Sequence, residues 1–155
     1  MANKKKASKK KRKSQAIPKL YHGTLKEHIK EIEKFGGIKE TQGWGGAGTF
    51  GVFLSGTYDA ALLWAKIAYM VQIHNEFNPF KFDRLFPSDA AWDQIVVLEV
   101  KIPKKFESLL RVDLEQAEDV GFEGNEYDWR ASLKQIGDVR FAAPVPISWL
   151  KQITP

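Results

Sequence analysis

The sequence predicts a single α+β domain, and three observations support this prediction. Two segments in the first half of the chain carry apolar residues at helical spacing. The second half instead holds short apolar runs of strand length, and no internal repeat is present. The length of 155 residues, of which 43% are hydrophobic, is enough to bury one core.

The first predicted elements are a strand at residues 20–22 and the helix that follows it. Thr24 and Glu27 stand at the spacing of a capping box, which predicts that the helix begins there. Apolar residues continue the pattern at helical spacing: Leu25, Ile29, Ile32 and Phe35. Gly36 and Gly37 predict the end of the helix, because glycine readily takes the left-handed C-cap conformation.

Residues 38–50 are rich in glycine, show no periodicity and predict a loop. The apolar run at residues 51–55 predicts a short strand. Residues 57–73 predict a second helix with Asp59 near its N-terminus. One face of that helix is expected to carry Ala60, Leu63, Trp64, Ile67 and Val71.

The second half of the chain predicts strands around residues 95–102 and 109–115, followed by an acidic, loop-like segment at residues 117–130. A last strand is expected to begin at about Asp138. It leads through a corner bounded by prolines into a short helix.

The glycine-rich loop contains a motif that has to be read in its context. Gly43, Gly45 and Gly48 have the G-x-G-x-x-G spacing of a dinucleotide-binding turn. That turn works only where it leaves a strand and opens a helix. Here the glycines follow a predicted helix and precede a predicted strand, which argues against a Rossmann fold.

The charge of the chain is concentrated in residues 1–15, which hold eight of its 24 basic residues and none of its 19 acidic ones. Residues 16–155 therefore carry about −3, although the whole chain carries +5. We interpret residues 1–15 as a disordered basic tail and residues 16–155 as the domain. The tail is either a solubilising leader or an arm that binds phosphates or acidic proteins.

Composition excludes several classes of site and location. The absence of cysteine excludes disulfides and thiolate metal sites, and it is compatible with a cytoplasmic location. No apolar run approaches the roughly 18 residues of a membrane span, and no export signal is recognised. His22, His28 and His74 lack zinc-site spacing, so we expect no metal. Neither a phosphate-binding P-loop nor a G-x-S-x-G elbow is present.

Four features in a fixed order carry a family resemblance. They are "LYHGT" at residues 20–24, a helix ending in Gly-Gly, "GVFLSGTYDAALLWA" at residues 51–65, and a late strand that starts at an acid and leads to "PVPISWL". Together they resemble the ADP-ribosyltransferase fold family, the NAD-cleaving group that includes diphtheria toxin, the poly-ADP-ribose polymerases and the RNA 2′-phosphotransferases. The resemblance covers residues 20–153. It implies a split antiparallel β-sheet core with flanking helices, and NAD as co-substrate.

The resemblance also implies roles for residues of the first two motifs. His22 would bond the adenosine ribose of NAD, and Thr24 completes the same H-G-T motif. Gly23 would offer its backbone N–H and C=O to the nicotinamide amide, at a close approach that a residue without Cβ permits. Phe53 stands where the family usually has a tyrosine that stacks on nicotinamide, and Ser55 would face the same pocket.

The third family motif usually places a glutamate at the head of the late strand, where it supports the transition state. The matching residue here is Asp138, which is one methylene shorter and can also be read as a turn residue after Gly137. Misplacing a catalytic group by about 1 Å can cost about 100-fold in rate. Glu126 is the alternative acid, and Tyr58 the nearest substitute if a phenol is needed. Trp44, in the glycine-rich loop, would cover NAD or contact the target, unless the loop is a plain connector.

The implied function is that of an NAD-dependent mono-ADP-ribosyltransferase with a macromolecular acceptor and no membrane partner. The basic tail slightly favours a nucleic acid, such as RNA, over protein as the acceptor. Four phenylalanines interleaved with two basic residues are either base-stacking groups or core anchors: Phe77, Phe80, Lys81, Phe82, Arg84 and Phe86. Small members of the family often act as toxins or in conflict with phages, which implies an antitoxin or inhibitor as partner.

Three alternatives to this enzyme stay open. The first is a binding module that has kept the fold and lost catalysis, which the departures at Phe53 and Asp138 support. The second is an NAD-dependent RNA 2′-phosphotransferase, which Phe53 argues against because that branch favours histidine at its position. The third is an RNA- or ribosome-binding protein that uses the basic tail alone and ignores NAD.

Overall fold

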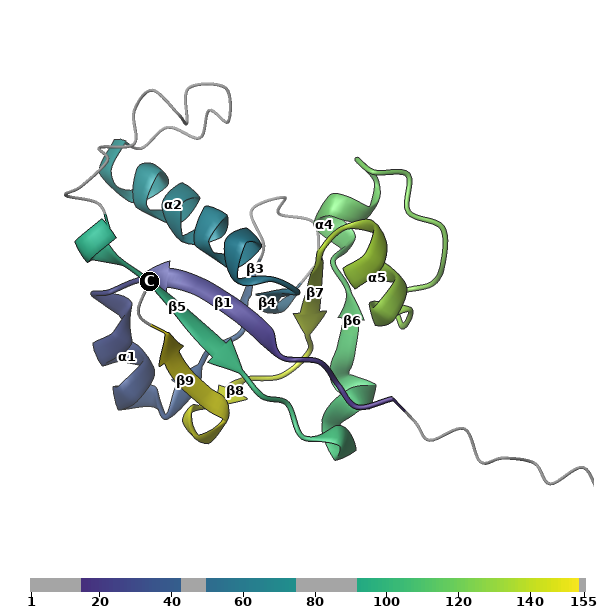
Figure 1. The fold of residues 1–155 in the computed structure, drawn as a ribbon, viewed down its shortest axis with the longest axis horizontal. Helices are drawn as coiled ribbons and strands as arrows, with labels where there is room; N and C mark the ends of the chain where they lie inside the picture. The colour runs from purple at the N-terminus through teal and green to yellow at the C-terminus, as the bar shows by residue number, and fades with distance from the viewer. Residues whose placement is uncertain (1–14, 43–49, 75–91, 154–155) are drawn as a thin grey trace, which may run out of the picture.

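The structure, a computed structural model, describes residues 15–42, 50–74 and 92–153. The described chain forms a mixed α+β domain around an antiparallel sheet, which confirms the predicted fold class (Figure 1). Along the sheet the strands run in the order β6-β7-β4-β1-β5-β9, and β3 pairs with β4 beside this path. Their bounds are β1 Leu20–Leu25, β3 Thr41–Gln42, β4 Phe50–Ser55, β5 Ile95–Val100, β6 Leu110–Val112, β7 Asp138–Phe141 and β9 Leu150–Ile153. A second small sheet pairs β2 (Gly37–Ile38) with β8 (Val145–Pro146).

The large sheet is divided where β1 meets β4. β1 pairs with β5 along all six of its residues, from Leu20 opposite Val100 to Leu25 opposite Ile95. With β4, in contrast, β1 shares a single pair of Cα partners, Tyr21 and Ser55. β4 instead pairs with β7 at four positions. The two strands therefore separate beyond Tyr21, and the sheet opens into two halves at this point.

Helix α1 (His28–Phe35) begins later than its sequence pattern predicts, so the predicted capping box is wrong. Thr24 is still part of β1, whose pairing with β5 extends through Leu25 and overrides the local helix signal. The Thr24 hydroxyl lies 3.1 Å from His28 Nδ1. The predicted end is confirmed, since Gly36 is left-handed with φ 87° and its N–H donates to the Ile32 carbonyl.

Helix α2 (Tyr58–His74) agrees with the predicted second helix and runs along β1 and β5 (Figure 1). The residues that it buries differ from the expected face. Ala61 and Ala65 are completely buried, whereas Leu63 is 48% exposed. The reason is a close approach to Gly23 in β1, where an added Cβ would lie 1.8 Å from the Ala61 carbonyl oxygen. Small side chains on α2 permit this approach.

Several predictions for the remaining elements need correction. The expected loop at residues 38–50 contains parts of β2, β3 and β4, and its residues 43–49 lie outside the described part of the chain. The strand around residues 109–115 is shorter, because α4 (Leu114–Ala117) follows β6. α5 (Trp129–Gln135) was not predicted. The expected C-terminal helix is only a 3-10 turn at Ile147–Trp149, and the last described residues form β9 against β5.

The core lies between the sheet and its covering elements. Its fully buried large side chains come mainly from β1, β4, β5, β6 and β7: Leu20, Val52, Leu54, Val97, Val100, Leu110, Val112, Val139 and Phe141. α4 and α5 lie beside β6 and β7, at the other end of the sheet from α1 (Figure 1). Within the described residues, no helix combines the length and the apolar character that crossing a membrane requires.

Candidate functional site

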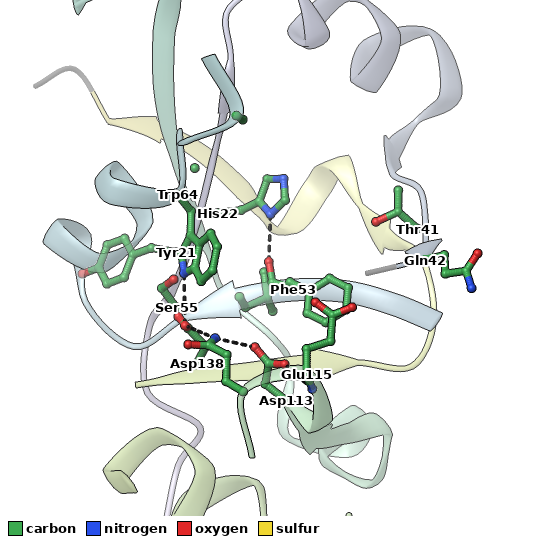
Figure 2. A pocket seen from close by; sticks show the side chains of 14 residues that line it. Tyr21, His22, Thr41, Gln42, Phe53, Ser55, Trp64, Asp113, Glu115 and Asp138 are labelled. Atoms are coloured by element: carbon green, nitrogen blue, oxygen red, sulfur yellow. Dashed lines mark hydrogen bonds between the residues drawn. The ribbon is translucent and has the colours of Figure 1, made fainter. Parts of the chain in front are cut away.

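Two adjoining hollows lie where β1 and β4 separate. The first, here called the inner pocket, has a volume of about 150 Å³ and is lined by residues from β1, β3, β4, α2, α4 and β7 (Figure 2). The second, here called the outer cavity, has a volume of about 800 Å³ and extends toward α1. His22, Gly23 and Phe53 line both. The two hollows therefore adjoin each other on either side of these three residues.

His22 spans the gap between the two strands. Its Nδ1 lies 2.9 Å from the backbone carbonyl oxygen of Phe53 (Figure 2). A carbonyl oxygen can only accept, so Nδ1 carries the proton and Nε2 of the neutral ring is left as an acceptor. Burial lowers the pKa of His22 from its ordinary 6.5; the bond to Phe53 opposes this shift, and His28 adds to it. His22 therefore stays neutral and can accept a hydrogen bond from a ligand hydroxyl.

This lowered pKa predicts an acid-sensitive fold. The unfolded chain takes up a proton on His22 near pH 6.5, whereas the folded chain takes it up only at lower pH. The free energy of unfolding should therefore decrease as the pH falls through 6.5 toward the folded-state pKa. His22→Asn, which keeps a donor for the Phe53 carbonyl and does not titrate, should lose less stability over this range in urea titrations at pH 5 and pH 7. Equal losses in the two proteins would contradict the prediction.

Asp138 is the first residue of β7 and pairs with Ser55 of β4. Its side chain is 6% exposed. Oδ2 accepts two hydrogen bonds, from Trp64 Nε1 at 3.0 Å and from Gln116 Nε2 at 2.7 Å (Figure 2). Oδ1 is buried and has no hydrogen-bond partner among the described residues. An unmet buried acceptor costs on the order of 1–3 kcal/mol.

A second buried carboxylate lies beside the first. Asp113, the N-cap of α4, is 3% exposed. Its Oδ1 accepts from the Glu115 backbone N–H at 3.1 Å, and its Oδ2 accepts from Gln116 Nε2 at 2.7 Å. Burial raises the pKa of Asp113 above its ordinary 3.8; the bond from Gln116 opposes this, and the charge of Asp138 adds to it. One amide thus links the two acids.

The raised pKa of Asp113 predicts the opposite pH dependence. Between pH 3.8 and the folded-state pKa, the folded chain holds a proton that the unfolded chain has lost. The contribution of Asp113 to stability should therefore be largest in acid and decrease as the pH rises through this window. Relative to the native protein, Asp113→Asn should gain stability as the pH rises from 4 to 7, measured by urea unfolding. A difference that stays constant with pH would contradict this.

The inner pocket is acidic and aromatic. Three of its lining side chains are carboxylates, namely Asp113, Glu115 and Asp138, and its lining residues include no lysine or arginine. Aromatic side chains from β1, β4 and α2 also line it: Tyr21, Phe53 and Trp64. Carboxylates and aromatic faces both attract a flat cation. No group of three or more histidine or carboxylate side chains within the described chain is arranged to hold a metal ion.

The structure brings most of the predicted site residues together. Lining the inner pocket are His22, Gly23, Phe53, Ser55 and Asp138. Thr24 lines only the outer cavity, where its hydroxyl meets His28. The alternative acid Glu126 is exposed and does not line the inner pocket. Tyr58 is partly buried and does not line it either.

Other predicted residues fall outside the described part of the chain. They are Trp44 with the rest of the loop at 43–49, the phenylalanine-rich stretch at 75–91, and the basic tail except Gln15. The sequence reasoning did not identify the other nine lining residues, and those that hydrogen-bond to Asp138 or add a carboxylate to the pocket are Trp64, Asp113, Glu115 and Gln116. The available signal was an acid, Asp113, inside the predicted strand at residues 109–115, but nothing local placed it beside Asp138.

The chain matches no known protein family, no curated protein and no solved structure in comparisons with each.

Proposed function

We propose that this chain is an NAD-dependent ADP-ribosyltransferase that transfers ADP-ribose from NAD to a macromolecular acceptor. The observation that carries the proposal is the meeting of His22, Phe53 and Asp138 in the inner pocket. These residues come from β1, β4 and β7, and they are the ones to which the family resemblance gives the three central roles. Strands far apart in sequence thus bring one candidate residue each to the opening of the sheet.

The described residues fit NAD in size and in chemistry. The inner pocket suits one flat ring, and the outer cavity, at about 800 Å³, lies within the range of pockets that hold cofactors. The acceptor at His22 Nε2 suits a sugar hydroxyl, and the carboxylate of Asp138 belongs to the pocket lining. Lys34 and Lys39 line the outer cavity and would attract the pyrophosphate. The three carboxylates of the inner pocket suit the positive charge of the nicotinamide ring.

In this proposal the protein contributes holding and electrostatics. Bound NAD supplies a glycosidic bond that breaks with its electron pair passing to nicotinamide, while the acceptor atom bonds to C1′ and releases a proton. Phe53 holds the ring by stacking, and His22 holds a ribose hydroxyl. The Asp138 carboxylate stabilises the positive charge that develops on the ribose. The buried walls of the pocket limit access of water.

A binding module without turnover is the second candidate, because of one structural feature. Asp138 is shorter than the family glutamate and is drawn back by two donors to a position only 6% exposed. Such a module would bind NAD and release no nicotinamide. The RNA 2′-phosphotransferase alternative finds less support, since the lining of the inner pocket contains one histidine and no arginine.

A transfer assay tests the proposal. Purified protein, NAD labelled in its adenylate and a cell extract separated into protein, RNA and DNA fractions are incubated together. We expect label in one fraction and stoichiometric nicotinamide release, both lost in His22→Ala. NAD binding by calorimetry without label or nicotinamide in any fraction would favour the binding module. Failure to bind NAD at all would refute the proposal and leave a function of the basic tail alone.

A further inference from the structure

We propose that Gln116 is a positioning residue, whose side-chain amide fixes the orientation of the Asp138 carboxylate by bonding to Asp113 and Asp138 at the same time. The expected effect of Gln116 on kcat rests on the proposed transferase function. The claim that Gln116 orients the Asp138 carboxylate does not. Gln116 belongs to α4, lines the inner pocket and donates to both acids.

The amide can lie in only one way. Gln116 Nε2 is 2.7 Å from Asp113 Oδ2 and 2.7 Å from Asp138 Oδ2, so each of its two hydrogens has one carboxylate oxygen. In the flipped orientation the amide oxygen would face two carboxylate oxygens, and all three are acceptors. The NH₂ group therefore separates the two acids with the donors that they require.

A buried frame holds both acids at this spacing. The Asp113 backbone N–H donates to Ser132 Oγ at 3.2 Å, and Ser132 Oγ donates to the Asp138 backbone carbonyl at 2.6 Å. Ser132 is fully buried. The end of β6 and the start of β7 are thus linked through one hydroxyl, and the side chains of Asp113 and Asp138 are linked through one amide.

These contacts make the two carboxylate oxygens of Asp138 different, because one accepts hydrogen bonds and the other does not. Gln116 and Trp64 both donate to Asp138 Oδ2, which leaves Oδ1 without a partner among the described residues. Without the Gln116 donor, two neighbouring buried carboxylates would repel each other, and one would take up a proton or rotate. Gln116 therefore acts through Asp138, by fixing the direction in which its carboxylate points.

The experiment uses the full chain and two substitutions of Gln116. Gln116→Leu has a similar volume and no donor. Gln116→Glu keeps the shape and can donate only when it is protonated. Nicotinamide release is measured against NAD concentration from pH 5 to pH 9. Gln135→Leu, which changes an exposed glutamine of α5 in the same way, is the control.

The two variants should behave differently. In Gln116→Leu we expect kcat to fall about 10- to 100-fold, the size of one hydrogen bond to a charged group, with KM for NAD changed less than about threefold. Gln116→Glu should be as impaired as Gln116→Leu at pH 9 and regain activity toward pH 5. The other titratable groups lining the pocket are Tyr21, His22, Asp113, Glu115 and Asp138. Each variant is therefore compared with the native profile at every pH.

The outcomes separate the two proposals. Native-like kcat in Gln116→Leu, or a Gln116→Glu profile parallel to the native one, overturns the positioning role. If the native protein releases no nicotinamide, the proposed function fails. The positioning role is then decided by ¹³C NMR of the Asp113 and Asp138 carboxyl carbons. The titration of Asp113, whose pKa the bond from Gln116 lowers, should move to higher pH in Gln116→Leu, or in Gln116→Glu if the leucine variant does not fold. An unmoved titration overturns the proposal.

Discussion

Asp138→Asn is expected to lower kcat for nicotinamide release by about 100-fold or more, the size of losing one electrostatic contact made in the transition state. The substitution preserves shape. Its side-chain oxygen can still accept from Trp64 and Gln116, so its NH₂ group takes the place of the unpartnered Oδ1. The negative charge is then lost, while the hydrogen bonds from Trp64 and Gln116 remain.

NAD affinity should change much less than turnover, because a charge that acts on the transition state contributes little to ground-state binding. Isothermal titration of NAD and initial-rate kinetics measure the two effects separately. The fold should persist, since removing the Asp138 charge removes one cause of the raised pKa of Asp113. Asp119→Asn, an exposed acid outside the pocket lining, should keep native kinetics. Full turnover in Asp138→Asn would show that the late strand does not supply the catalytic acid.

The parts of the fold that the sequence predicted are those specified by local chemistry. The helix end at Gly36 depends on one left-handed residue. Strand β4 and helix α2 depend on apolar runs and spacing within their own residues. The capping box failed because the decisive interaction was distant, with β5 pairing along β1 to Leu25. β9 was missed for the same reason, since its strand character comes from its pairing with β5.

The same distinction between local and distant interactions applies to the candidate site. His22, Phe53 and Asp138 could be chosen from short motifs, each recognisable within a few residues. The contacts that orient Asp138 could not, because Trp64 and Gln116 come from helices 74 and 22 residues away in the chain. A motif thus predicts which group is present, whereas the hydrogen bonds that decide its charge and direction depend on the packing of α2 and α4 against the sheet.

Gly23→Ala is expected to destabilise the fold by about 3 kcal/mol or more, at the upper end of overpacking effects. An ideal Cβ at Gly23 would lie 1.8 Å from the Ala61 carbonyl oxygen, 2.7 Å from its carbonyl carbon and 2.9 Å from the Ala65 nitrogen. All three are backbone atoms of α2, so no side-chain rotation can relieve the contact. The helix would have to move away from β1 and lose its packing over Ala61 and Ala65.

Urea unfolding at pH 7 measures this effect against a matched glycine substitution. Gly36→Ala introduces a Cβ at a left-handed residue with no atom within 4 Å, so it should cost only about 1 kcal/mol. Gly23→Ala/Ala61→Gly should be no more stable than Gly23→Ala, because the clash does not involve the Ala61 side chain. Equal stabilities of Gly23→Ala and Gly36→Ala would contradict the close approach of α2 to β1. The expected result would show that the glycine of the H-G-T motif is required by packing, whether or not its backbone also binds a ligand.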